Sequence, residues 1–219
     1  MIKSTSRFAP LVTLFRGNDK SEREMMTQLA RVCVLYEDIQ IEFVAATANA
    51  MPELDRIGAH ARKLYFIRRS LATLMELDGA FHQLNKNDDF KVVRAWMKHW
   101  HQQLWDDGIK FFAANKQFLK DWRNDVGGHF HQSAATFALA DLHPQAVGLV
   151  EIFLRGSGAD ARLPFAADLV GSAMAKLKPK GQSDEEFFKE AFSLTVTATK
   201  HVVEMVGVLT LECLLPRCK

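Results

Sequence analysis

Long stripes of apolar residues at helical spacing are the feature that most constrains the fold of this chain. Between residues 25 and 43 the apolar positions recur at alternating intervals of four and three: Met25, Leu29, Val32, Tyr36, Ile39 and Phe43. A second stripe follows Pro52, which suits the first turn of a helix, and runs on to Leu84. Amphipathic helices of this length bury their apolar faces against one another, so the sequence predicts an all-α bundle.

Three further helical stretches are predicted downstream. A third helix is expected over residues 90–126, with a bend at Gly108, and a fourth over 129–142 after the Gly127-Gly128 pair. Another helix is expected over residues 166–177. Ser183 and Glu186 have the spacing of a capping box, which predicts a last long helix ending near Leu214. At the other end of the chain, Ser21 is the expected N-cap of the first helix.

One stretch departs from helical character. Residues 147–154 are apolar and β-prone, a Gly-Ser-Gly turn follows, and residues 162–165 could return as a second strand. The sequence therefore predicts a small β-hairpin insertion near residues 147–166. Because no linker divides the chain, a single domain is expected over residues 1–219, with its core in 21–142 and with the hairpin and C-terminal helices in 147–215.

Composition limits the functional classes. The 28 basic and 26 acidic side chains give a net charge of +2, so nucleic acid can be attracted only by a local patch. The 3 cysteines form no disulfide framework, which favours a reducing, cytoplasmic location. The apolar run over residues 193–215 is punctuated by charged residues at helical spacing, so we expect a buried helix and no membrane contact.

Several patterns that resemble functional motifs have simpler interpretations. His99 and His101 would point to opposite sides of one helix, so they cannot share a metal ion there. The nearby Trp96, Trp100 and Trp105 are interpreted as core residues, with the histidines at the edge of the core. Neither Cys213 nor Cys218 has a neighbouring base that would activate a thiol. We expect no metal site and no cofactor.

The segment around Gly127-Gly128 has more specific chemistry. Arg123 would lie in the last turn of one helix, followed by Asn124, and His129 would begin the next helix. Arginine can hold a phosphate through two parallel N–H donors, and histidine can transfer a proton near neutral pH. Together they suffice for metal-free attack of a ribose 2′-hydroxyl on the adjacent phosphodiester. The alternative is that both residues only cap and join the two helices.

Neighbouring residues could support this site. Asp125 and His131 could orient His129, although each also fits a plain surface position. A basic stretch on the second predicted helix comprises Arg62, Lys63, Arg68 and Arg69. It could contact RNA phosphates, or it could be an ordinary solvated face.

The Arg123-Asn124…His129 segment resembles the motif of the HEPN superfamily, in which an arginine and a polar residue precede a histidine. Here five residues separate Arg123 from His129, within the four to six of the motif. The resemblance implies a helical bundle in which Arg123, Asn124 and His129 are catalytic. It also implies a metal-independent endoribonuclease of a toxin–antitoxin or phage-defence system, with RNA as substrate and a cognate antitoxin protein as a partner.

Two functional hypotheses therefore remain open at this stage. One is the ribonuclease. The other is a catalytically silent helical module that dimerises or binds a nucleotide or a protein, as some members of the superfamily do. A homodimer is expected in both cases, because two motifs meet in the family dimers. The apolar cluster of Phe111, Phe112, Phe118 and Trp122 also exceeds what one helix face can hide.

Overall fold

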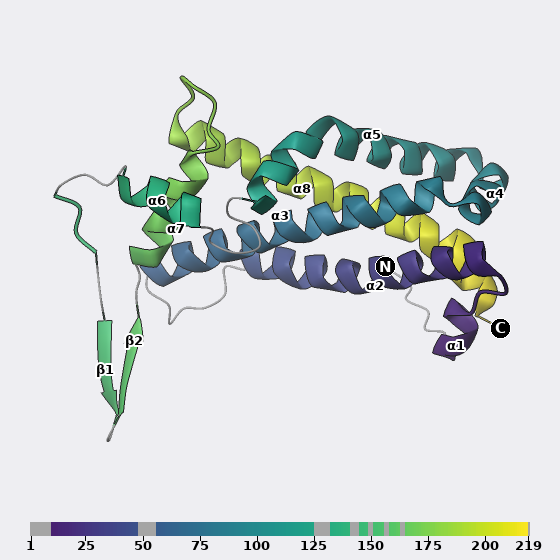
Figure 1. Ribbon diagram of the computed structural model, residues 1–219, viewed down its shortest axis with the longest axis horizontal. Helices are drawn as coiled ribbons and strands as arrows, with labels where there is room; N and C mark the ends of the chain where they lie inside the picture. Colours follow the sequence, from purple (N-terminus) through teal and green to yellow (C-terminus); the bar gives the residue numbers. More distant parts are fainter. Residues whose placement is uncertain are drawn as a thin grey trace, which may run out of the picture. The chain divides into compact units, whose positions relative to one another are not determined.

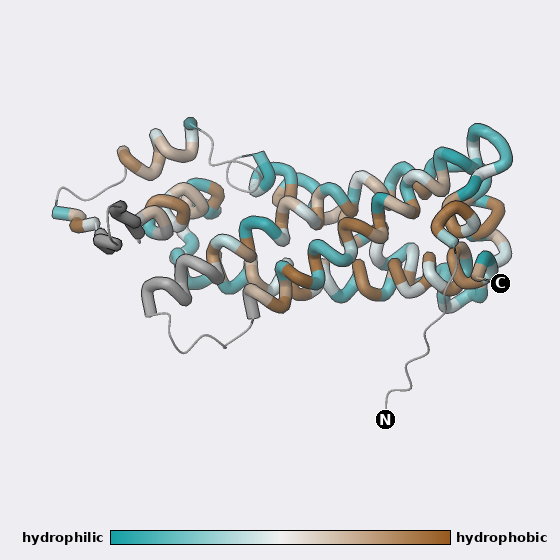
Figure 2. The backbone as a smooth tube through the Cα atoms, turned by 90° about the horizontal axis from the view of Figure 1, so that it is seen from below, coloured by the Kyte–Doolittle hydropathy of each residue, from teal (hydrophilic) through white to brown (hydrophobic). Residues whose placement is uncertain are grey.

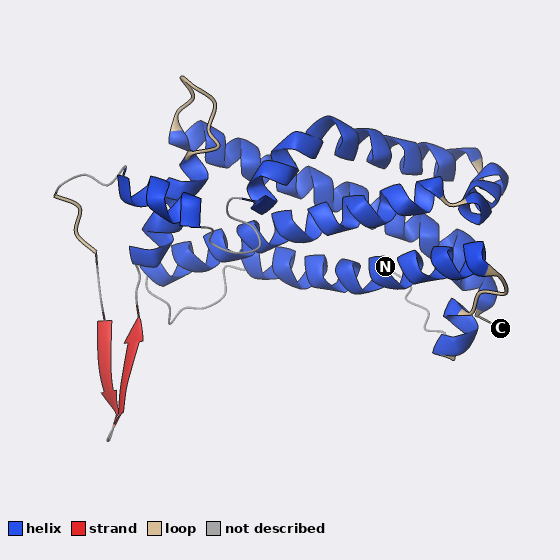
Figure 3. Cartoon of the chain, viewed as in Figure 1, coloured by secondary structure: helices blue, strands red, loops and turns tan. Residues whose placement is uncertain are grey.

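The chain is predominantly helical, as the stripes predict. The structure is a computed structural model that describes residues 10–47, 56–124, 132–140, 145–148, 151–155, 158–162 and 165–218. The described α-helices and strands are labelled in Figure 1 and coloured by type in Figure 3. Their bounds are α1 (Leu11–Phe15), α2 (Lys20–Thr47), α3 (Arg56–Lys86), α4 (Asp88–Trp96), α5 (His99–Trp122), α6 (Gln132–Ala140), α7 (Phe165–Ala175) and α8 (Asp184–Leu209).

The helices group into two compact units, each assembled from separate stretches of the chain. Unit 1 comprises residues 1–38, 76–115 and 197–219, and unit 2 comprises residues 39–75 and 116–196. Helices α2, α3, α5 and α8 each contribute residues to both units. Polar and apolar residues alternate along these helices (Figure 2), as expected of amphipathic helices with one buried face.

The core of unit 1 is built around aromatic rings. Trp105 of α5 is fully buried, and its ring lies 4.8 Å from Phe90 and 5.7 Å from Phe81. Phe112, two turns further along α5, lies 6.0 Å from Phe81. Edge-on and tilted ring pairs of this kind add about 0.5–1.5 kcal/mol each beyond simple burial. Met205 of α8 is also completely buried in this unit.

The core of unit 2 is centred on Trp122, the last residue of α5. Its ring stacks on Phe187 of α8 at 5.8 Å and lies 5.5 Å from Phe118. Phe187 is 2% exposed, and Trp122 is fully buried. The burial of Phe112 and Trp122 means that much of the apolar cluster from which the sequence predicts a dimer is hidden within the chain itself.

The predicted third helix is two helices. The chain leaves α4 at Met97, whose backbone is extended, and α5 begins at His99. Asn87 caps α4 by accepting a hydrogen bond from the Phe90 amide at 3.0 Å. The break restarts the helical phase, so the buried positions of α5 differ from those predicted for one continuous helix.

Helix boundaries follow local capping chemistry. The predicted cap at Ser183 is confirmed, because its hydroxyl accepts from the Glu186 amide at 3.3 Å and Glu186 accepts from the Ser183 amide at 3.0 Å. The Ser183 amide and hydroxyl both donate to the Glu186 carboxylate, and these two hydrogen bonds lower the pKa of Glu186. The predicted cap at Ser21 is wrong: Asp19 accepts from the Glu22 amide at 2.9 Å, so the cap of α2 lies two residues earlier and the helix begins at Lys20.

The C-terminal end of α8 changes its winding. A π-helical turn over Thr210–Leu214 and a 3-10 turn over Leu215–Arg217 follow α8. Among the described residues, the stretch Asp184–Arg217 is long and apolar enough to cross a membrane by length and composition alone. Core helices pass the same criterion, and much of its apolar surface lines the two cores.

A pair of strands interrupts the helices. Strands β1 (Glu151–Arg155) and β2 (Gly158–Arg162) are antiparallel, with Glu151 opposite Arg162 and Arg155 opposite Gly158. The second strand thus starts four residues before the expected return at residue 162, and helix α7 already begins at Phe165. These short strands leave the fold class all-α.

Gly108 lies inside α5, where the sequence predicted a bend. In the structure it marks a close approach between α5 and Met205 of α8. A Cβ atom at this position would lie 2.2 Å from the Met205 Sδ and 2.8 Å from its Cγ, whereas at Gly79 of α3 a Cβ would meet nothing within 4 Å. The missing side chain of Gly108 therefore provides the space that Met205 fills in the core of unit 1.

This contrast gives a stability prediction. Gly108→Ala should lower the free energy of unfolding by about 1–3 kcal/mol, because the added methyl group overpacks the core against Met205. The matched variant Gly79→Ala should raise it by about 0.5–1 kcal/mol, because alanine favours the helix without a steric cost. Urea denaturation followed by circular dichroism measures both changes. Equal effects of the two substitutions would contradict the close approach.

Candidate functional site

Arg123 and Asn124 are exposed at the end of α5 in unit 2. The preceding residue, Trp122, is fully buried against Phe187 and fixes this end of the helix. The helical winding loosens to a π-type turn at residues 123 and 124, which carries both side chains out of the core. The Trp122 Nε1 donor is buried and has no acceptor among the described residues. The first two residues of the predicted motif thus lie exposed directly after a buried aromatic residue.

The rest of the predicted motif lies outside the described residues. Asp125, His129 and His131 all fall between Asn124 and the start of α6 at Gln132. The distance from Arg123 to His129 therefore stays a prediction. Helix α5 ends at Trp122, before the motif, and the described part of α6 begins at Gln132, after it.

Arg69, proposed as a phosphate contact, has an intramolecular partner. Its Nε lies 3.6 Å from the Oε1 of Glu42 on α2, and Thr73 donates a hydrogen bond to the same oxygen at 3.1 Å. Glu42 is 8% exposed, so its carboxylate needs compensation inside unit 2. Arg69 therefore stabilises a buried charge, and any role in binding would come in addition.

Arg68 is held differently from its neighbour. Its guanidinium carbon lies 5.6 Å from the centre of the Tyr65 ring, a cation–π contact within one turn of α3. Burial lowers the pKa of Arg68, and the charge of Arg69 lowers it further. The side chains of the preceding basic residues, Arg62 and Lys63, are not described. Two of the four basic residues in this stretch thus form specific contacts within unit 2.

His101 is a core residue of unit 1, whereas the sequence predicted a position at the edge of the core. It is 3% exposed, and its Nδ1 pairs with Glu212 in the π-helical turn after α8. The adjacent Cys213 is buried, and burial together with the charge of Glu212 raises the pKa of its thiol to about 12. This thiol is protonated at neutral pH, which agrees with the expectation that Cys213 is not a nucleophile.

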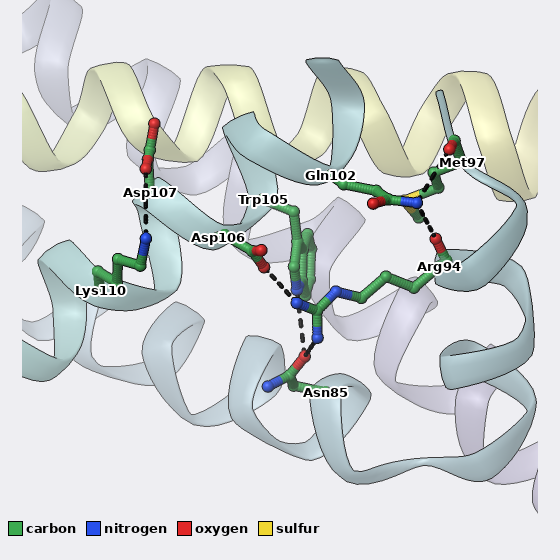
Figure 4. Close-up of polar contacts among 8 residues, drawn as sticks. All are labelled: Asn85, Arg94, Met97, Gln102, Trp105, Asp106, Asp107 and Lys110. Atoms are coloured by element: carbon green, nitrogen blue, oxygen red, sulfur yellow. Dashed lines mark hydrogen bonds and ion pairs between the residues drawn. The ribbon is translucent and has the colours of Figure 1, made fainter. Parts of the chain in front are cut away.

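A partly buried polar network joins α3, α4 and α5 in unit 1 (Figure 4). Asn85 accepts hydrogen bonds from Arg94 at 3.1 Å and from the Trp105 indole at 3.3 Å. Arg94 also pairs with Asp106. Gln102 donates to the carbonyl oxygens of Arg94 and Met97, both at 3.0 Å. The network fixes the corner between α4 and α5.

Two of the three tryptophans interpreted as core residues are exposed at this corner. Trp96 is 85% exposed and Trp100 is 53% exposed, whereas Trp105 is buried. The interpretation failed because α4 ends at Trp96, so the indole rings before and after the break do not follow the stripe that buries Trp105. Trp96 lies off the apolar stripe of Phe90, Val93 and Met97, and this was the sequence signal that could have revealed its exposure.

Other candidate sites are less developed. A polar hollow of about 230 Å³ in unit 1 is lined by Glu24, Gln28, Gln83, Lys86 and Asn87. Asn87 already caps α4 and donates to the Ser21 carbonyl at 2.9 Å, which explains its presence structurally. Across the described ranges, no group of three histidine, cysteine or acidic side chains is placed to hold a metal ion.

Comparisons with known proteins give no further guidance. No protein-family model matches the chain, and no curated protein or solved structure is detectably similar to it. A functional proposal for this chain therefore depends on the residues described above and on the motif.

The pairing of Arg69 with Glu42 is testable by rescue. Arg69→Ala should lower the free energy of unfolding by about 1–2 kcal/mol, because it removes a cation that compensates the buried Glu42 carboxylate. Adding Glu42→Gln should restore most of this loss, since the amide stays a hydrogen-bond acceptor without a charge. Denaturant midpoints measure both effects. Arg68→Ala is the control, and Glu42→Gln should not rescue it; an unrescued Arg69 variant would refute the structural role.

Proposed function

We propose that this protein is a HEPN-like, metal-independent endoribonuclease. The observation that carries the proposal is the exposure of Arg123 and Asn124 at the anchored end of α5, directly before the segment that contains His129. Its context is the toxin–antitoxin or phage-defence pair that the resemblance implies, with a cytoplasmic location and a cognate antitoxin protein as partner.

The proposed reaction follows from the three side chains. The guanidinium of Arg123 binds the scissile phosphate and offsets the negative charge that grows in the transition state. His129 removes the proton from the 2′-hydroxyl or donates one to the leaving 5′-oxygen. The 2′-oxygen then attacks phosphorus, the bond to the 5′-oxygen breaks, and a 2′,3′-cyclic phosphate remains on the upstream fragment. Asn124 orients the other two groups.

One observation favours the alternative, a catalytically silent helical module. The net charge of +2 gives no global attraction for RNA, whereas many ribonucleases have a strongly basic surface. In this alternative Arg123 and His129 only cap and join helices. Direct assay separates the two functions.

Cleavage of single-stranded RNA in the presence of EDTA is the expected activity, with 2′,3′-cyclic phosphate or 3′-phosphate ends. Arg123→Ala should reduce the rate about 100-fold or more, and His129→Ala about 10²–10⁴-fold. Asn124→Ala should cost less, because it acts through orientation. Gel analysis of end-labelled RNA with end-group mapping measures each rate.

Lys120→Ala provides the matched control. Lys120 is an exposed cation in the last turn of the same helix, outside the motif. Its removal should leave cleavage unchanged, and none of the variants should unfold the protein. Wild-type protein that is inert on varied RNAs would reject the ribonuclease and leave the silent module.

A homodimer is part of the proposal, because the resemblance implies that two motifs meet. Unit 2 offers exposed apolar residues that a second copy could cover. Ile41 and Val44 on α2 are 65% and 60% exposed, and Phe192 and Val196 on α8 are 41% and 38% exposed. Each pair is spaced to share one helix face. These residues replace the buried phenylalanine and tryptophan cluster as the candidate interface.

Light scattering after gel filtration should give twice the chain mass of 24.8 kDa. Phe192→Asp should shift the protein toward monomer, because it places a charge in an apolar interface. The control Val147→Asp should leave the dimer intact, since Val147 is 93% exposed and lies outside the helices. A wild-type monomer at micromolar concentration would refute the dimer.

A further inference from the structure

The corner between α4 and α5 in unit 1 exposes an unusual amount of aromatic surface. Trp96 is 85% exposed, Trp100 is 53% exposed and Val92 on α4 is 60% exposed. Trp96 and Trp100 are four residues apart, so their Cα atoms are at most about 14 Å from each other. Large aromatic side chains are seldom left in water without a function, because each can bury 150–250 Å².

The charges around these rings are mixed, with Asp88 and Asp89 before them and Asp106 and Asp107 after them. The sequence has no acidic residue between positions 90 and 105. The exposed polar residues beside the tryptophans are Lys91, Lys98, His99 and Gln103. Lys91 pairs with Asp88 at 2.7 Å at the start of α4. Arg94 likewise pairs with Asp106, so the cation that the corner offers beside the two rings is Lys98, which lies between them in the sequence.

The two rings are carried by rigid elements. Gln102 donates hydrogen bonds to the carbonyl oxygens of Arg94 and Met97, which flank Trp96 in the sequence. Met97 itself is only 4% exposed. On the α5 side, the Trp100 ring centre lies 3.7 Å from that of the buried His101, which pairs with Glu212. A site on fixed helices loses little conformational entropy when it binds a ligand.

We propose that this corner binds single-stranded nucleic acid, with bases stacked on Trp96 and Trp100 and a backbone phosphate near Lys98. Stacking needs an accessible ring face, and a phosphate needs a nearby cation; the corner supplies both. A protein interface fits less well, because lysine is depleted from interface cores. A membrane fits less well, because only three large apolar residues are exposed among polar ones. The surface is separate from the proposed catalytic motif and does not depend on cleavage.

The test measures binding without chemistry. A fluorescein-labelled single-stranded DNA of about 12 nucleotides lacks the 2′-hydroxyl, so the proposed ribonuclease cannot cleave it, but its bases can still stack. Fluorescence anisotropy should show salt-dependent binding that is stronger than binding of the matching duplex. Trp96→Ala should weaken the affinity about five- to hundredfold. Lys98→Gln should weaken it and reduce the salt dependence.

Matched substitutions distinguish stacking from general apolar contact. Trp96→Phe should retain most of the affinity, whereas Trp96→Leu, which stays apolar but cannot stack, should behave like Trp96→Ala. Val34→Ala is the control, because Val34 is also 63% exposed in unit 1 but is not aromatic, and it should bind like the wild type.

Three results would overturn the proposal. They are the absence of binding, an affinity that Trp96→Ala leaves unchanged, and adsorption to phosphatidylglycerol vesicles without binding of the oligonucleotide. Failure of RNA cleavage would reject the proposed ribonuclease but would leave the DNA-binding result, and hence this proposal, unaffected.

Discussion

The complete burial of Trp105 is the constraint on which unit 1 depends. An indole ring inside a protein needs apolar neighbours on its faces and an acceptor for its N–H group. Phe81 and Phe90 provide the first, and Asn85 provides the second. Asn85 lies on α3, so α3 must pack close enough to α5 for Asn85 to accept the hydrogen bond from the Trp105 indole. Asn85 also accepts a hydrogen bond from Arg94 on α4. One buried ring therefore determines how α3, α4 and α5 meet in this unit.

The helices themselves were predictable because they depend on local patterns. Apolar spacing identified α2 and α3, and the Ser183–Glu186 capping box identified the start of α8. The phase of α5, that is, which of its residues face the core, was not predictable from local spacing. The sequence suggested Trp100 and Trp105 as core residues and His101 as an edge residue, but Trp100 is exposed and His101 is buried beside Trp105. This phase depends on the break at Met97 and on Glu212, which is distant in sequence and pairs with His101.

The candidate site was predictable only in part, for a related reason. The motif predicts which residues would carry the chemistry, and the helix end at Trp122 places Arg123 and Asn124 on the surface. The role of Arg69 could not be inferred from its neighbours in the basic stretch. Its partner, Glu42, lies on another helix, and whether a carboxylate is buried depends on packing and not on local spacing. Contacts between distant residues thus limit what a single sequence reveals about function.

Both ends of α5 follow the same physical arrangement, each within its own unit. An exposed side chain that we propose to bind a ligand directly adjoins a buried residue: Trp100 adjoins His101, and Arg123 adjoins Trp122. The buried residue loses its freedom on folding, so the neighbouring backbone is already ordered before a ligand arrives. The exposed side chain contributes little to the core, because few of its atoms are removed from water. Stability and binding therefore depend on adjacent but different residues, which allows each to change while the other is preserved.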